Sequence, residues 1–300
     1  MPLPSPPGRP PGWIPPGQRN PQVIMGGSKV IGVGHRVVVS SGAGPSGFID
    51  GHTLSQMMTI MGDRAIRMFL PFFETDAADD TPVQDAGPRG HHFLKHTTSD
   101  QPPYIKGHVL AYRLNGVDEA FDMADHPDFS FGDSVEDSPF SLGIAVRFDD
   151  PTSDTLICRY DGTVTFEAVE YQLYTSGTGR ILFDLYDNVP AIKIGRYYNT
   201  PLVEDVWYII IGTYDGGGTS AGVRIYLNGV RVDDLNSVAG AYVAMHNEAV
   251  VTSIGYYEGD GGALAGFVNG DVWGSFIIGK ELSAGEALSL TNLYRRVLGL

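Results

Sequence analysis

Cysteine, long apolar runs and positive charge are all scarce in this chain. The single cysteine, Cys158, excludes a disulfide within the chain, and its apolar flank predicts a strand that buries an unreactive thiol. No segment approaches the ~18 uninterrupted apolar residues of a membrane-spanning helix, so membrane insertion is not expected. With 20 Lys and Arg against 35 Asp and Glu, the net charge of −15 argues against nucleic acid and anionic membranes as partners.

Apolar residues and turn formers are plentiful. Hydrophobic residues make up 42% of the chain and aromatic residues 11%, which is enough to build a core and to exclude disorder throughout. The 39 glycines and 20 prolines favour many short strands joined by tight turns over long helices. The composition therefore predicts an all-β protein.

The first 64 residues differ from the rest in proline content and in charge. Nine prolines lie within residues 1–22, which favours extended polyproline II. Residues 1–64 carry five basic and two acidic residues, whereas residues 65–300 carry 15 basic and 33 acidic residues. We expect a basic anchoring arm over residues 1–64, with one short helix near residues 53–61, and an acidic folded domain over residues 65–300. The residues expected to anchor the arm are Arg9, Trp13, Arg19, Lys29 and Arg36.

Two alternatives concern the N-terminal segment. A tail without any partner would show the same composition. The first twenty residues also lack the apolar stretch and the cleavage region of a secretion signal. We therefore expect the protein to be made and released in the cytosol, unless a signal has already been removed.

Turn chemistry and apolar spacing predict several elements after residue 65. Asn-Gly pairs favour two-residue hairpin turns, because both positions of a type I′ turn take positive φ. They occur at residues 115–116, 228–229 and 269–270. In the middle hairpin, we expect Leu227 to pair with Val230. The segment 206–211 is apolar at every position, which predicts an interior strand with Trp207 in the core.

The strongest helix signal is at the C-terminal end of the chain. Ser283 and Glu286 have the spacing of a capping box, in which each residue satisfies a backbone amide of the other. Apolar residues then follow at helical spacing. They are Ala287, Leu290, Tyr294 and Val297.

The run 207–229, WYIIIGTYDGGGTSAGVRIYLNG, resembles the central signature of laminin G-like, concanavalin A-like jelly rolls. In that family a tryptophan strand leads to a TYDG turn and then to a YxNG hairpin. Residues 113–118 and 137–150 resemble the early strands of the family, and residues 254–294 resemble its closing segment. The resemblance covers residues 66–300 and leaves out the arm. The sequence segments DSPFS, TYDG and NGVRVDD are most similar to domains of phage structural proteins.

The resemblance implies a two-sheet antiparallel β-sandwich, a jelly roll, with an extended N-terminal arm and a short C-terminal helix. It also implies that the first strand, near residues 69–73, pairs with the last strand, near residues 275–278. The family includes lectins, calcium-dependent adhesion modules, accessory domains of glycosidases and phage particle proteins. The fold alone therefore does not select a function.

Catalytic motifs are missing from the sequence. Related glycoside hydrolases place acids at alternate positions of one strand, whereas Glu167 and Glu170 lie three apart and so on opposite strand faces. No nucleophile elbow, zinc helix or phosphate loop occurs. His91, His92 and His96 have a spacing that suggests a metal, but their polar surroundings favour a solvated loop. The sequence predicts a protein that is not an enzyme and requires no cofactor.

Calcium is the one ion that the resemblance suggests. Hard cations take oxygen ligands from loops, and Asp118 and Asp271 each adjoin an Asn-Gly pair. The alternative for each is an ordinary solvated aspartate in a turn.

A glycan site is suggested by aromatic and acidic residues that follow one another near the end of a strand. Tyr256 and Tyr257 are placed to stack on a sugar ring, and Glu258 and Asp260 to accept hydrogen bonds from its hydroxyls. The alternative is that both tyrosines pack within a sheet.

Three hypotheses of function remain. The favoured one is a non-enzymatic virion structural protein, either a capsid decoration protein or a tail or fibre component. Its arm would dock on major capsid or tail proteins, and its jelly roll would project from the virion surface to reinforce the particle or adhere to host glycans. The second is a secreted or surface carbohydrate-binding lectin, which would be extracellular. The third and least favoured is a glycoside hydrolase. A homo-oligomer is compatible with each of them.

Overall fold

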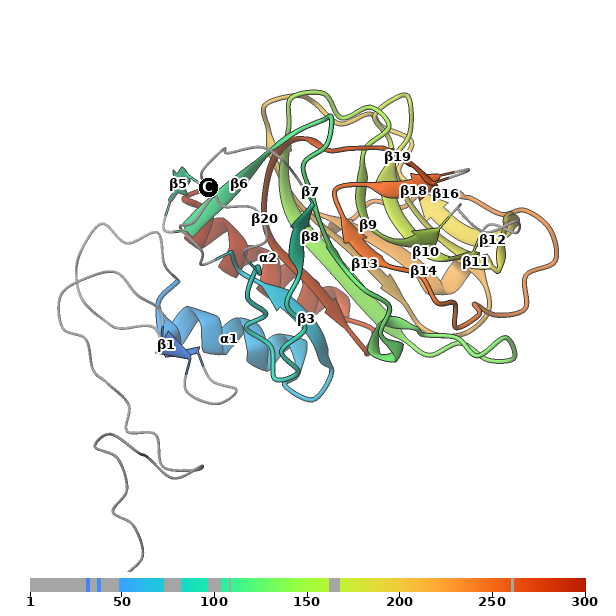
Figure 1. The fold of residues 1–300 in the computed structure, drawn as a ribbon, viewed down its shortest axis with the longest axis horizontal. Helices are drawn as coiled ribbons and strands as arrows, with labels where there is room; N and C mark the ends of the chain where they lie inside the picture. Colours follow the sequence, from blue (N-terminus) through green and yellow to red (C-terminus); the bar gives the residue numbers. More distant parts are fainter. Residues whose placement is uncertain are drawn as a thin grey trace, which may run out of the picture.

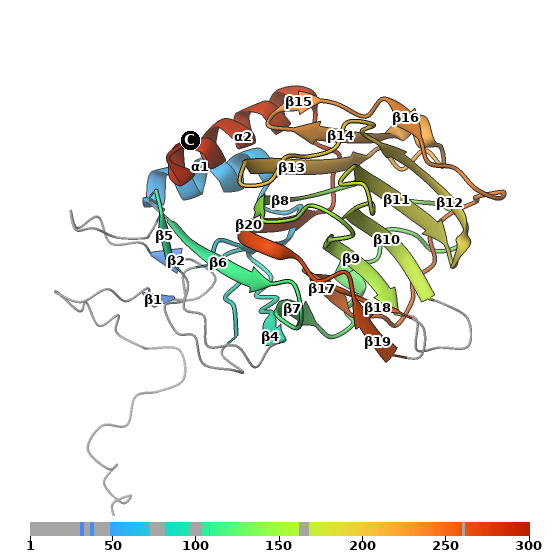
Figure 2. The same cartoon turned by 90° about the horizontal axis from the view of Figure 1, so that it is seen from above.

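The computed structural model describes residues 31–32, 37–38, 49–72, 82–96, 104–107, 109–161, 168–259 and 262–300. Two antiparallel sheets pack face to face, and two helices lie on the outer face of one of them (Figures 1 and 2). We name that sheet the helix-covered sheet and the other the groove sheet. The predicted all-β jelly roll with a C-terminal helix is confirmed. In the described part of the chain, no helix is long and apolar enough to cross a membrane.

The helix-covered sheet contains the central strands of the sandwich. Its order is β15 (Val230–Arg231), β14 (Val223–Leu227), β13 (Trp207–Tyr214), β8 (Phe140–Phe148), β20 (Asn269–Ile278), β6 (Val109–Asn115) and β5 (Tyr104–Lys106), with β3 (Ile66–Leu70) also paired to β20. Phe69 of β3 lies opposite Phe276 of β20, so the predicted pairing of the first and last strands is confirmed.

The groove sheet forms the other layer. Its order is β16 (Leu235–Asn236), β12 (Val189–Tyr197), β11 (Ile181–Asp187), β10 (Ala168–Thr175), β9 (Thr155–Asp161), β17 (Thr252–Ile254), β7 (Ala120–Met123) and β4 (Leu94–His96). The hairpin of β18 (Tyr257–Gly259) and β19 (Ala263–Ala265) joins it beside β9. A separate pair, β1 (Ile31–Gly32) and β2 (Val37–Val38), lies outside both sheets.

Strand β13 is buried along its whole length. Side chains of a strand alternate between two faces, so burial at every position requires a cover on each side. One cover is the groove sheet, and the other is helix α2 (Ala284–Leu298), which contacts β13. Trp207 is buried, as predicted, and the helix layer explains why this strand is apolar on both faces.

Helix α2 begins and ends at clear capping signals. The Ser283 side chain accepts a hydrogen bond from the backbone of Glu286, and the Glu286 side chain accepts one from the backbone of Ser283. Gly299 ends the helix in the left-handed conformation, with φ 66°. Leu290 and Tyr294 are fully buried, so the helix predicted from the sequence is confirmed.

Helix α1 (Gly51–Met61) also belongs to the folded domain. Asp50 caps it by accepting a hydrogen bond from the Thr53 amide at 2.9 Å. Leu54 and Met57 are buried in the same apolar cluster as the sandwich core, and α1 packs against α2. The helix was expected, but the boundary at residue 64 was placed too late. Its apolar face makes it part of the core rather than of an arm.

The three Asn-Gly pairs adopt three different structures. Residues 228–229 form the predicted hairpin, with positive φ at both positions (52° and 83°) and Leu227 paired with Val230. Residues 115–116 instead connect β6 of one sheet to β7 of the other, with positive φ at the glycine alone. Residues 269–270 lie inside β20. The last two hairpin predictions are therefore wrong, because the flanking strands pair with other partners.

Candidate functional site

Alternation along the groove sheet determines which side chains face away from the core. Gln172 of β10 lies opposite Asp184 of β11, and Tyr186 of β11 lies opposite Lys193 of β12. Their neighbour along β11, Phe183, is fully buried in the apolar cluster between the sheets. Because successive residues of a strand point to opposite faces, these polar and aromatic side chains lie on the outer face. Figure 2 shows both helices on the opposite side of the molecule.

A groove lined by tyrosines crosses this outer face, with a volume of about 330 Å³. It is lined by Ser153, Thr155, Tyr160, Gln172, Tyr174, Thr175, Ser176, Gly177, Tyr186 and Tyr257. We name it the tyrosine groove. Tyr160, Tyr174 and Tyr257 are half-buried, whereas Tyr186 is buried. The rings of Tyr160 and Tyr257 meet edge to face, with centroids 5.3 Å apart.

Fixed hydrogen-bonding groups lie between the rings of the tyrosine groove. Gln172 Nε2 donates to Thr155 Oγ1 at 3.1 Å, and the Tyr186 hydroxyl lies 3.5 Å from Gln172 Oε1. The amide is therefore held between two strands and cannot rotate freely. The groove combines aromatic faces with positioned donors and acceptors, which is the chemistry of a small-molecule site.

A second, basic pocket adjoins the tyrosine groove, with a volume of about 370 Å³. It is lined by Ser176, Thr178, Arg180, Leu182, Lys193, Tyr197, Asn236, Ser237 and Val238. Ser176 lines both spaces. Tyr174 of the tyrosine groove pairs directly with Leu182 of the basic pocket, so the two spaces form neighbouring parts of one surface.

Asp184 connects the two spaces, because it pairs with one residue of each. It is fully buried, and its Oδ2 accepts hydrogen bonds from Lys193 Nζ at 2.6 Å and from the Tyr174 hydroxyl at 2.9 Å. Burial raises the pKa of Asp184, although Lys193 opposes the shift. Its cross-strand partner is Gly195, which leaves room for the carboxylate where any larger residue would meet it.

The structure separates the four residues predicted to bind a glycan. Tyr256 is only 3% exposed, its hydroxyl donates to Asp122, and its ring stacks on Phe267. It is therefore a packing residue, and the prediction for it is wrong. Tyr257 lines the tyrosine groove. Glu258 is half-buried in β18 beside β9, and Asp260 lies outside the described residues.

The two predicted calcium ligands also lie in different surroundings. Asp271 is buried in β20, where it accepts hydrogen bonds from Arg147 at 2.6 Å and contacts Arg113. Two arginines balance its charge, so it is not placed to bind calcium and the prediction for it is wrong. Asp118 is half-buried in the bend between β6 and β7 and accepts a hydrogen bond from Asn115 Nδ2 at 2.8 Å. Calcium at Asp118 stays a prediction.

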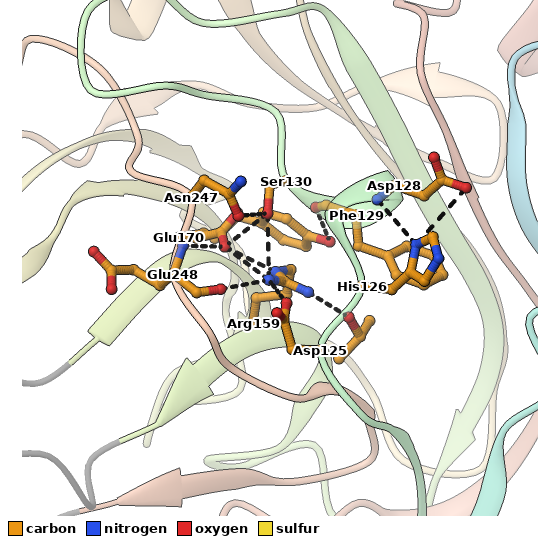
Figure 3. Close-up of polar contacts among 11 residues, drawn as sticks. Asp125, His126, Asp128, Phe129, Ser130, Arg159, Glu170, Asn247 and Glu248 are labelled. Atoms are coloured by element: carbon orange, nitrogen blue, oxygen red, sulfur yellow. Dashed lines mark hydrogen bonds and ion pairs between the residues drawn. The ribbon is translucent and has the colours of Figure 1, made fainter.

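Glu170, one of the two acids considered for catalysis, is held in a buried ion pair (Figure 3). Arg159 Nε donates to Glu170 Oε1 at 3.0 Å, and both side chains are 0% exposed. Arg159 also contacts Asp125 and the Glu248 carbonyl, each at 2.8 Å. This cluster ties β9 and β10 to two loops and leaves Glu170 without access to solvent. Glu167 lies outside the described residues.

One group of side chains that could hold a metal ion occurs among the residues that the structure describes, namely His91, His126 and Asp128. Their ligand atoms lie within 4.8 Å of one another, and His91 Nε2 is 2.8 Å from Asp128 Oδ2. Arg89 also pairs with Asp128 and balances its charge without a metal. Burial alone would raise the pKa of Asp128, but hydrogen bonds from His91 and Arg89 lower it. The expected solvated loop is wrong for His91, whose side chain is 10% exposed and packs on the His126 ring.

Two groups of residues remain: those predicted to anchor the arm, and those that line the two spaces but were not predicted. Arg9, Trp13, Arg19, Lys29 and Arg36 all lie outside the described residues. Sequence reasoning missed Tyr160, Gln172, Tyr174 and Tyr186 of the tyrosine groove and Arg180 of the basic pocket. The sequence pattern that could have identified them is alternation: along β10 and β11, polar and aromatic residues alternate with the buried residues Leu173, Phe183 and Leu185.

The fold is a two-sheet jelly roll. A family model described as the concanavalin A-like lectin/glucanases superfamily matches residues 121–286, which is more than half of the chain. The protein belongs to this superfamily. No curated protein sequence matches the chain.

Among the solved structures that share the fold, two illustrate it. One is domain 4 of AbnA, an extracellular arabinanase from Geobacillus stearothermophilus, in complex with arabinotriose; it has a TM-score of 0.52 and 12% identity, over 76% of this chain and 98% of that one. The other is botulinum neurotoxin type C, with a TM-score of 0.52 and 14% identity, over 79% of this chain and 52% of that one. This chain therefore spans about half the length of the neurotoxin chain. Identities this low establish the fold alone.

Proposed function

We propose that this protein is a non-enzymatic carbohydrate-binding jelly roll that holds a glycan in the tyrosine groove. The observation that carries the proposal is the convergence of Tyr160, Tyr174 and Tyr257 with the fixed amide of Gln172 on one uncovered sheet face. Sugar rings have apolar C–H faces that stack on aromatic rings, and their hydroxyls need positioned hydrogen-bond partners.

The comparisons support this proposal at the level of the fold. The arabinanase domain was solved with arabinotriose, and cell entry of neurotoxin type C depends on interaction with two ganglioside molecules. Binding without catalysis agrees with the buried ion pair of Glu170, which keeps that acid from any bound glycan. Calcium is not needed for this mode of binding.

The test is a glycan array followed by calorimetry on the full chain. Tyr160→Ala and Tyr257→Ala each remove a half-buried ring, and each should weaken binding of an array-positive glycan at least about tenfold. Tyr198→Ala is the matched control, because Tyr198 is also half-buried but lines neither space. Unchanged affinity in both groove variants would refute the proposal.

A role on a virion is the finer part of the proposal, and the segregation of charge along the chain supports it. The N-terminal residues are basic and rich in proline, whereas the folded domain is acidic. A restricted, extended arm loses little entropy when it docks on capsid or tail proteins. The domain would then stand at the virion surface. An extracellular lectin is the alternative, with the same groove but no particle.

Deletion of residues 1–48 tests the virion role, because it removes the arm and keeps helix α1. The deleted protein should remain folded and bind glycan, but it should no longer co-purify with particles. Full occupancy of particles by the deleted protein would contradict the role of the arm. Co-purification of the intact chain with no particle at all would favour the extracellular lectin.

A further inference from the structure

Arg180 brings an unbalanced positive charge to the basic pocket, which adjoins the tyrosine groove. The turn before β11 fixes its backbone, because Ser176 N donates to the Arg180 carbonyl at 2.9 Å and Arg180 N donates to Ser176 Oγ at 3.3 Å. Its side chain lines the basic pocket. Among the described residues, no carboxylate forms an ion pair with Arg180, and its enclosed Nε has no hydrogen-bond partner.

The other cation of the basic pocket is already balanced. Lys193 pairs with buried Asp184 at 2.6 Å, so the positive charge that remains in the pocket is that of Arg180. The whole chain carries a net charge of −15, which makes an uncompensated arginine in a pocket unusual. A buried polar group without a partner is unfavourable, so no protein group at Nε holds the guanidinium in place and its charge is left for a ligand in the pocket.

The chemistry of arginine narrows the ligand. Its planar guanidinium presents parallel N–H groups that match the two oxygens of a carboxylate. The basic pocket and the tyrosine groove share Ser176, and Tyr174 pairs with Leu182 across their boundary. One ligand that spans both would place a sugar ring on the tyrosines and a carboxylate at Arg180.

We infer that the groove binds an acidic glycan, in which a neutral sugar is joined to a sugar that carries a carboxylate. This inference rests on the proposed glycan function and adds the class of ligand. Tyr160 and Tyr257 hold the neutral ring, and Arg180 selects the charged one. Asn236 and Ser237 of the basic pocket supply further groups for hydroxyls of the acidic sugar.

The experiment uses matched ligands. A uronic-acid oligosaccharide is compared by calorimetry with the same oligosaccharide after its carboxyl groups are reduced to alcohols, on the full chain. The wild type should bind the acidic form at least about tenfold more tightly. Arg180→Gln should remove that preference and keep the affinity for the reduced form, and Arg180→Lys should restore part of it. Arg296→Gln, an exposed arginine of α2, is the control and should change neither affinity.

The outcomes separate this inference from the proposed function. Equal binding of the two oligosaccharides, with loss in Tyr257→Ala, would refute the acidic ligand and keep the glycan groove. Binding of neither one, with an array that is negative throughout, would refute the glycan function itself. Tighter binding of a sulfated analogue than of the carboxylate would also overturn the inference, because it would show selection by charge alone.

Discussion

Both outer faces of the sandwich carry tyrosine rings packed edge to face, but the ring is fully buried on one face and half-buried on the other. On the helix-covered sheet, Tyr294 of α2 is fully buried, and its ring lies edge to face against Trp273, with centroids 4.8 Å apart. On the groove sheet, Tyr160 and Tyr257 are also edge to face but stay half-buried. An aromatic pair under a helix belongs to the core, whereas the same pair on an uncovered sheet is available to a ligand.

The groove sheet contains buried charged residues, which stability alone does not require. Asp184 and Arg159 are fully buried charged residues on this side of the sandwich. A buried ion pair gains little over apolar residues of similar size, because the charges lose their hydration. The same holds for Asp271 of the helix-covered sheet, which is buried and pairs with Arg147, so buried charge is common to both sheets and does not distinguish them.

Tyr294→Ala attacks the covered face and should have the largest effect. It removes a buried ring and leaves a cavity between α2 and β20, so we expect a loss of about 3–5 kcal/mol in the free energy of unfolding. Thermal unfolding would show this as a lower Tm. Glycan affinity, measured where the variant is still folded, should stay unchanged. A variant with normal stability and reduced affinity would reverse the assignment of the two faces.

Asp154→Asn concerns a buried acid just before β9. Asp154 Oδ2 has no hydrogen-bond partner among the described residues, and burial raises its pKa from 3.8 to about 8. The unfolded chain ionises this group near pH 4 and the folded chain does not, so its stabilising contribution is complete below that pH and is lost as the pH rises towards 8.

The neutral asparagine should remove that loss, raising the free energy of unfolding by up to about 4 kcal/mol at pH 7 and by little at pH 3. Denaturant unfolding at both values measures it. A gain of equal size at both pH values would show that the carboxyl group is not the cause.

Local signals account for the parts of the fold that the sequence predicted. The hairpin at residues 228–229 depends on two adjacent residues with positive φ, and α2 depends on a capping box followed by helical spacing. Both are decided within a few residues. The strand 207–214 was also predictable, because its unbroken apolar character requires burial on both sides.

Long-range packing decides the parts that the sequence did not predict. The Asn115-Gly116 pair carries a hairpin signal, but β6 pairs with β20 and β7 pairs with β17. Tyr257 and Tyr256 are adjacent in sequence, yet one lines the groove and the other is buried against Phe267. Alternation shows that two adjacent residues face opposite ways, but only the position of the helices and of the β18–β19 hairpin shows which face is open.

Gly195→Ala tests how the groove sheet holds its buried acid. A Cβ at this position would lie within contact of Asp184 Oδ1 and 2.6 Å from the Phe183 carbonyl, so the carboxylate or the strand must move. We expect a loss of about 1–3 kcal/mol in the free energy of unfolding, together with weaker glycan binding because Tyr174 loses the carboxylate that holds its ring in the groove. Gly285→Ala, in α2 with open space around it, is the control and should cost nothing. Normal stability and affinity in Gly195→Ala would mean that Asp184 does not organise the site.

Tyr174→Phe should have the smallest effect and is the sharpest test of how the groove works. The change keeps the ring and removes only the hydroxyl that donates to Asp184 at 2.9 Å. We expect a loss of about 1 kcal/mol in stability, since Lys193 still pairs with the buried carboxylate, and less than about a twofold change in affinity for a neutral glycan. Tyr197→Phe is the matched control, because its hydroxyl makes no hydrogen bond to any residue that the structure describes. If Tyr174→Phe abolished glycan binding while stability stayed normal, the hydroxyl rather than the aromatic face would be what the ligand contacts, and the stacking mode proposed for this sheet would be wrong.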